Sequence, residues 1–140
     1  MAVFLVLALE SLAVAQASVD TVAVSDTRSS EDAARRWLAI VDSGRADQSW
    51  DSAATALRAQ FDRQTWERIV RAARAQVDPL NARRLVSTER LQSLPQVPPG
   101  DYLLFHFSST DRSGAPVLET VALSLESDRL WRVLAYWLRR

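Results

Sequence analysis

The sequence has no cysteine and no lysine, and it has one histidine in 140 residues. Without cysteine, the chain cannot form disulfides, thiol nucleophiles, zinc-thiolate centres or lipid anchors on cysteine. A single histidine also makes an all-protein transition-metal site improbable. We therefore predict no metal and no cofactor.

The charge is balanced, since 17 arginines face 17 acidic residues and the formal net charge is zero. A neutral chain has no overall field that would attract nucleic acid or an anionic membrane. We therefore predict no nucleic-acid partner. The exclusive use of arginine is typical of a GC-rich coding bias, and we give it no functional weight.

The amino terminus is typical of an export signal. Residues 2–9 are an unbroken apolar run, followed by the small-residue cleavage sites Ala13-Val14-Ala15 and Ala15-Gln16-Ala17. No basic residue precedes the run and Glu10 ends it early, and it is far shorter than the roughly 20 residues of a membrane-spanning helix. We predict a cleaved signal at residues 1–17, an exported protein that is periplasmic or secreted, and no stable membrane span.

The remainder is enough for one domain with one core, since 48% of the chain is hydrophobic. A small, polar stretch at residues 18–30 predicts a flexible leader, and the domain is placed at residues 31–140. Apolar residues at helical spacing predict three helices, in the third of which Arg74 lies near the polar side. The first is expected to begin at Ser29 or Ser30 and end at Gly44, the second to run from a cap at Asp47 through Phe61, and the third to begin at Asp62 and end before Pro79.

After residue 80 the pattern changes to segments rich in aromatic and β-branched residues, separated by turn residues. Four strands are predicted, with the sequences RRLVSTERLQSL, DYLLFHFSS, APVLETVALSLES and LWRVLAYWLR. The fold class is therefore α+β, with three N-terminal helices packed on a curved, mostly antiparallel four-stranded sheet.

Several motifs follow one another in a fixed order. They are W-L-x-x-V-D-x-G from Trp37, S-W-x-x-A-A from Ser49, R-x-L-V-S from Arg83, P-G-D-Y around Gly100, E-T-V from Glu119, and W-R-V from Trp131 with Tyr136. Together they resemble the bacterial domain-of-unknown-function family 4019. The resemblance implies small exported or membrane-associated proteins with no established activity, and it supplies no catalytic residue. One departure is Ala135, where a glycine is expected before the tyrosine. The order of helices and sheet also looks like the NTF2-like or cystatin-like cone.

Strand alternation places Glu119 on the apolar face of the third strand, beside Val121. A carboxylate on that face must be paired, hydrogen-bonded or protonated. It could act as a general acid or base at the mouth of a pocket, or it could form a structural ion pair, which we favour. The candidate partners are Arg74, Arg83 and Arg132.

The aromatic and histidine side chains give weaker signals. His106 is predicted to be a surface strand residue. Trp50 is a candidate lining residue of an interior pocket, because an indole fills space unevenly and its N–H needs a partner. Trp131 and Trp137 are expected to share one face of the last strand with Val133.

The other face of the sheet is expected to carry an apolar patch that a partner covers. Its predicted members are Leu104, Leu118, Leu134, Tyr136 and Leu138. The simplest partner is a second copy of the chain, so a homodimer through this outer face is predicted.

Two functions of different class remain open. The first is an exported, non-catalytic module that binds a small hydrophobic ligand or an envelope protein. The second is a small isomerase or dehydratase with Glu119 as acid or base. The first is favoured, because the sequence has no G-x-S-x-G, H-E-x-x-H or glycine-rich phosphate loop. Asp42, Gly44, Asp47 and Asp51 also lack the frame of a calcium loop, so this stretch predicts a helical hairpin.

Overall fold

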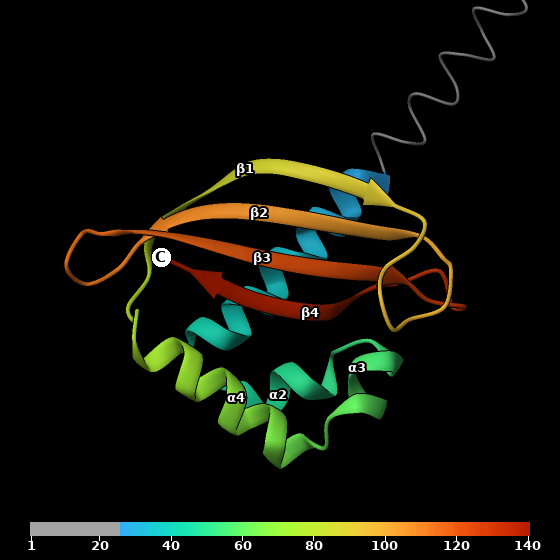
Figure 1. Ribbon diagram of the computed structural model, residues 1–140, viewed down its shortest axis with the longest axis horizontal. Helices are drawn as coiled ribbons and strands as arrows, with labels where there is room; N and C mark the ends of the chain where they lie inside the picture. The colour runs from blue at the N-terminus through green and yellow to red at the C-terminus, as the bar shows by residue number, and fades with distance from the viewer. Residues whose placement is uncertain (1–25) are drawn as a thin grey trace, which may run out of the picture.

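The computed structural model describes residues 26–140. This part contains four helices and one antiparallel sheet with the strand order β1-β2-β3-β4, as Figure 1 shows. The predicted α+β class is confirmed. The predicted signal and leader residues 18–25 lie outside the described residues. No helix between residues 26 and 140 has the length and apolar character needed to cross a membrane.

The first helix covers residues 26–42 and lies behind the sheet in Figure 1. Three further helices are grouped beside β4: α2 (Ala46–Asp51), α3 (Thr55–Gln60) and α4 (Arg63–Ala75). The strands are β1 (Asn81–Leu91), β2 (Tyr102–Thr110), β3 (Pro116–Leu125) and β4 (Trp131–Arg139). All four predicted strand segments are present.

The first helix begins earlier than the sequence predicted. Residues 26–30 are already helical, and Ser30 is fully buried, so a cap at Ser29 or Ser30 is wrong. The sheet holds this turn in place, because the Asp26 carboxylate accepts hydrogen bonds from the Trp131 indole at 2.8 Å and from Arg90 at 2.7 Å. These partners are distant in sequence, and local composition could not reveal them.

The predicted second helix is two short helices, α2 and α3. Asp47 lies in the first turn of α2 and is not its cap. The break occurs where the Ala54 N–H donates to the Val133 carbonyl of β4 at 2.8 Å. Glu126, from the β3–β4 hairpin, then accepts from the Thr55 N–H at 2.8 Å and so caps α3. Two contacts with the sheet thus outweigh a continuous helical periodicity.

The start of α4 agrees with the sequence. The Asp62 carboxylate accepts a hydrogen bond from the Thr65 N–H at 2.8 Å, so the predicted cap is confirmed. This bond lowers the pKa of Asp62 below its ordinary value. The helix buries Trp66, Val70 and Arg74. Arg74 is therefore on the buried side, and its predicted position near the polar side is wrong.

The core lies between the first helix, α4 and the inner face of the sheet. Its tryptophans are all hydrogen-bonded at the indole N–H: Trp37 donates to the Ser49 carbonyl at 2.9 Å and Trp66 to the Ser49 hydroxyl at 2.9 Å. Trp37 also packs edge-on against Tyr136, with ring centroids 5.2 Å apart. The helical hairpin predicted around Trp37 thus presents both helices to one core.

An irregularity in β4 reverses the faces of its last residues. Ala122 pairs with Ala135 and Leu123 pairs with Val133, so Leu134 is an extra residue in the ladder. After this bulge Tyr136 points inward with Val121, whereas Trp137 points outward with Thr120. The predicted faces of Tyr136, Trp137 and Leu138 are therefore wrong.

Candidate functional site

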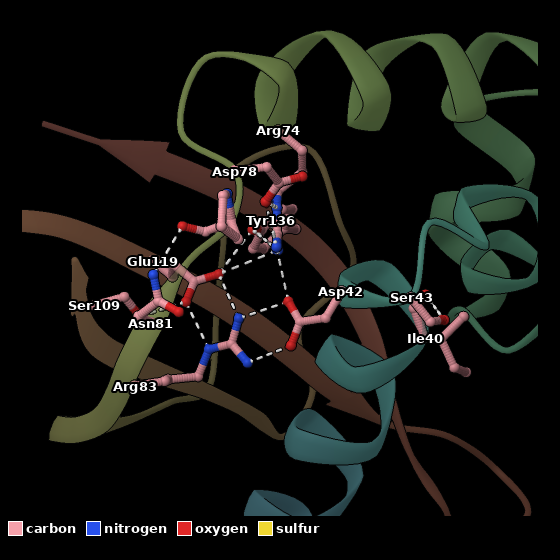
Figure 2. A network of polar contacts seen from close by, with 11 residues as sticks. Ile40, Asp42, Ser43, Arg74, Asp78, Asn81, Arg83, Ser109, Glu119 and Tyr136 are labelled. Atoms are coloured by element: carbon pink, nitrogen blue, oxygen red, sulfur yellow. Dashed lines mark hydrogen bonds and ion pairs between the residues drawn. The ribbon is translucent and has the colours of Figure 1, made fainter. Parts of the chain in front are cut away.

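Glu119 occupies the centre of a polar cluster inside the core. Its side chain is 0% exposed and lies on the inner face of β3, as alternation predicted. Oε2 accepts from Arg83 Nε at 2.6 Å and from the Ser109 hydroxyl at 2.9 Å. Oε1 accepts from the Tyr136 hydroxyl at 2.9 Å and from Arg83 Nη2 at 3.2 Å. Figure 2 shows these groups converging on the carboxylate.

A second carboxylate, Asp42 at the end of the first helix, joins the cluster from the other side. It accepts from Arg83 at 2.7 and 2.9 Å and from Arg74 at 2.8 Å. Arg74 also donates to Asp78 at 2.7 Å and lies 3.7 Å from Glu119. The two guanidinium groups therefore bridge three carboxylates, as Figure 2 shows.

The cluster takes one residue from almost every element of the domain. Asp42 comes from the first helix, Arg74 from α4, Arg83 from β1 and Glu119 from β3; Ser109 and Tyr136 come from β2 and β4. It therefore connects the first helix and α4 to the sheet.

The pKa shifts within the cluster favour the protonation states that form its ion pairs and hydrogen bonds. Burial acts to lower the pKa of Arg83, but hydrogen bonds to Asp42 and Glu119 outweigh it and raise that pKa above its ordinary value. Burial acts to raise the pKa of Asp42, but Arg83 and Arg74 lower it overall. Burial and the charge of Glu119 raise the pKa of Tyr136, so its phenol stays protonated as a donor. The cluster is a network of fixed ion pairs.

Of the predicted partners of Glu119, the structure brings together Arg83 and Arg74. Arg132 is not a partner, because it pairs with Asp128 at 2.7 Å and Glu126 at 3.3 Å in the adjacent hairpin. Trp50 is not bonded to the cluster, because its indole N–H donates to the Phe61 carbonyl at 2.7 Å. Every buried side-chain nitrogen and oxygen in residues 26–140 has a hydrogen-bond partner.

Sequence reasoning missed Asp42, Ser109 and Tyr136 as members of the cluster. The sequence places Asp42 in the last turn of the first predicted helix without indicating a partner for it, and the bulge in β4 reverses the predicted direction of Tyr136. Ser109 is on the same face of β2 as Phe105 and Phe107, which are buried in the core, and this alternation is the signal that could have placed it.

His106 lies on the face opposite Glu119. It pairs with Thr120 across the strands, while Phe107 pairs with Glu119. Its ring nitrogens are hydrogen-bonded to Thr120 at 2.9 Å and to Glu89 at 3.0 Å. The two titratable groups are therefore separated by the sheet and form no dyad. Among residues 26–140, no three carboxylate or imidazole side chains are grouped as metal ligands.

A groove of about 650 Å³, which we call the outer groove, lies on the outer face of the sheet. Its walls are the loop of residues 94–98 and α3, and Trp137 lies at its end with 46% of its surface exposed. Its floor includes the cross-strand pair Ala122 and Ala135, whose small side chains leave the space open. None of the residues that line it is charged.

Comparison with known proteins places the chain in a family. The model of the family described as "Protein of unknown function (DUF4019)" matches residues 33–136, which is most of the chain. The chain belongs to the DUF4019 family. The resemblance seen in the ordered motifs is thereby confirmed. No curated protein matches this DUF4019 chain in sequence.

A solved structure of a protein from Catenulispora acidiphila, determined at 2.5 Å, has a similar fold. The TM-score is 0.52 at 12% identity, over 89% of this DUF4019 chain and 93% of the other. At that identity the likeness concerns the fold alone. Ala135, where the family resemblance led us to expect a glycine, lies on the floor of the outer groove.

Proposed function

We propose that this DUF4019 protein is a non-catalytic binding module that holds a small, uncharged hydrophobic ligand in the outer groove. The observation that carries the proposal is the uncharged lining of this groove. Ligand sites are typically apolar concavities of about 300–1,000 Å³, and the outer groove lies in that range.

The wall of the outer groove formed by residues 94–98 is anchored. The Tyr102 hydroxyl donates to the Pro98 carbonyl, and the Gly100 N–H donates to the Gln92 carbonyl at 3.0 Å. Three prolines within residues 95–99 restrict the backbone further. A groove with a fixed wall requires less ordering when a ligand binds.

The saturation of Glu119 supports a binding role over an acid–base enzyme. Both carboxylate oxygens already accept hydrogen bonds within the chain, and two arginines hold the charge. A general acid or base needs an oxygen within reach of substrate, which this arrangement does not offer.

The test is the fluorescence of the uncharged probe N-phenyl-1-naphthylamine on titration with the protein. We expect saturable binding that Ala135→Leu weakens by about tenfold or more, since leucine fills the floor and tenfold corresponds to about 1.4 kcal/mol. Ala39→Leu makes the same change at an exposed position of the first helix and should leave binding unchanged. Trp137→Ala is a second groove variant that removes an exposed side chain. Equal affinity in all four proteins would refute the proposal.

A second copy of the chain could cover the same surface and form the homodimer predicted through the outer face. The structure leaves less apolar surface for it than predicted, because Leu104 is buried within the chain and Tyr136 faces the core. Sedimentation of the wild type and Trp137→Ala distinguishes the two. A monomer that binds the probe supports the ligand proposal. A dimer that does not bind the probe, and that Trp137→Ala dissociates, would show that a second copy of the chain occupies the outer groove.

We also propose that the protein is exported, on the strength of the apolar run and cleavage sites in residues 1–17. Mass spectrometry of the protein expressed in a bacterial host should show a mature chain that begins after Ala15 or Ala17. An intact amino terminus on protein recovered from the cytoplasm would contradict export.

A further inference from the structure

A second groove, of about 660 Å³, lies between the first helix and the β3–β4 hairpin, and we call it the arginine groove. Its cationic lining residues are Arg36, Arg129 and Arg132, and its large apolar ones are Trp37, Ile40, Leu130 and Trp131. It shares no residue with the outer groove. Its chemistry differs because it combines positive charge with apolar surface.

The positive charge of the arginine groove is only partly neutralised. Arg132 is held by Asp128 and Glu126. The ion pairs within residues 26–140 include neither Arg36 nor Arg129, and both side chains are exposed. The charged residues that line the groove are therefore three arginines and one carboxylate, Asp51.

Two carboxylates beside the groove, Asp51 and Asp26, are bonded to groups other than Arg36 and Arg129. Asp51, the acid that lines the groove, is paired with Arg63 at 2.7 Å. Burial acts to raise the pKa of Asp26, but hydrogen bonds from Trp131 and Arg90, together with the charges of Arg90 and Arg129, lower it overall. The Asp26 oxygens therefore accept hydrogen bonds from Arg90 and Trp131, and Asp26 interacts with Arg129 by charge alone, without a hydrogen bond.

The backbone at Arg129 is in an unusual conformation. Its φ of 66° lies in the left-handed region, at the end of the short turn that joins β3 to β4. Glycine adopts this conformation without steric cost, whereas in arginine the Cβ atom makes it unfavourable. A strained residue on the rim of a groove is a reason to look for a role there.

The apolar part of the arginine groove is accessible. Leu130 is 56% exposed, which is unusual for a large aliphatic side chain, and Ile40 is partly exposed. Beside them, the rings of Trp37 and Trp131 are buried and fixed by hydrogen bonds at their N–H groups. An elongated apolar body can therefore lie along a preformed surface.

We propose that the arginine groove binds a free, monomeric anionic amphiphile, with its acid group at Arg36 and Arg129 and its apolar body against Leu130 and Ile40. A carboxylate or phosphate head supplies the anion that the two guanidinium groups lack, and arginine binds such groups in a bidentate manner. An uncharged ligand would leave Arg36 and Arg129 without an anionic partner. The arginine groove therefore differs from the outer groove in the charge of the ligand that it should bind.

The test is the set of indole N–H resonances in ¹H–¹⁵N spectra, recorded during titration with decanoate, decanol or acetate. Trp37 and Trp131 line the arginine groove, while Trp137 lines the outer groove. We expect decanoate to shift the Trp131 resonance, decanol to leave it in place, and acetate at equal concentration to leave it in place too.

Two variants and a control complete the test. Arg36→Gln and Arg129→Gly should each weaken decanoate binding by about tenfold or more. Arg129→Gly replaces a strained residue by glycine, so it keeps the fold and separates lost binding from unfolding. Arg84→Gln removes an exposed arginine of β1 outside both grooves and should leave decanoate affinity unchanged.

Three results would overturn the proposal: decanoate binding that both groove variants leave intact, a shift of Trp131 by decanol as large as that by decanoate, or binding to anionic lipid vesicles without binding to monomeric decanoate. The proposed function of the outer groove is tested separately. Binding of the uncharged probe there, and its loss in Ala135→Leu, should change the indole resonance of Trp137 and leave that of Trp131 in place.

Discussion

Replacing Glu119 by glutamine tests whether the central cluster is structural. Glutamine keeps the shape of the side chain but removes its charge, and its N–H₂ group faces a donor of Arg83 and either the Ser109 or the Tyr136 hydroxyl. Breaking a buried ion pair by removing one partner costs about 3–5 kcal/mol. Because Arg83 keeps its bonds to Asp42, we expect the lower end, about 3 kcal/mol.

A loss of this size is readily measured. For a domain of this length it corresponds to a fall of roughly 10 °C in Tm. The assay is urea unfolding followed by tryptophan fluorescence, with wild type and variant compared at pH 7. The matched control is Glu67→Gln, which breaks an i,i+4 pair with Arg71 on the surface of α4 and should cost about 0.5 kcal/mol or less.

The reasoning would be refuted if Glu119→Gln cost no more than Glu67→Gln. A double-mutant cycle with Arg83→Gln sharpens the test, because two groups in direct contact should show a coupling of about 0.5–3 kcal/mol. Coupling near zero would mean that the short contact of 2.6 Å between Arg83 and Glu119 adds nothing to stability.

Three further predictions concern Tyr136, Asp42 and the helix cap Asp62. Tyr136→Phe removes a hydrogen bond to the buried carboxylate and should cost about 2 kcal/mol in urea unfolding; a cost near zero would contradict this bond. The pKa of Asp42 is lowered in the folded state, so its stabilisation is present above the unfolded pKa and is lost as pH falls through the folded pKa. Tm should therefore fall with pH below about 4, and less steeply in Asp42→Asn; equal slopes would exclude a contribution from Asp42. Asp62→Ala should lower Tm more than Asp47→Ala does, because only Asp62 caps its helix; the reverse order would contradict the cap.

The position of Glu119 could be predicted because β3 is regular. Its pairing with β2 has no register shift, so a period of two places Glu119 with Val121 and Leu123. Two of its three candidate arginines are partners: Arg74 reaches Glu119 from α4, and Arg83 reaches it from β1, two strands away in the same sheet. The third, Arg132, is captured by Asp128 four residues before it, a contact within its own hairpin.

The last strand could not be predicted in the same way. One extra residue, Leu134, reverses every face after it, and nothing in the local composition signals its presence. Tyr136 therefore reaches Glu119 and Trp137 reaches the outer groove, each opposite to expectation. The break between α2 and α3 has a similar origin, since the hydrogen bonds that cause it come from β4 and the β3–β4 hairpin.

The structure of the protein bound to an uncharged apolar ligand, such as N-phenyl-1-naphthylamine, tests the central claim most directly. The account predicts ligand density between residues 94–98 and Trp137, above Ala135, with the contacts of Glu119 to Arg83, Ser109 and Tyr136 unchanged. Ligand density at the Glu119 carboxylate, with any of these contacts broken, would contradict it.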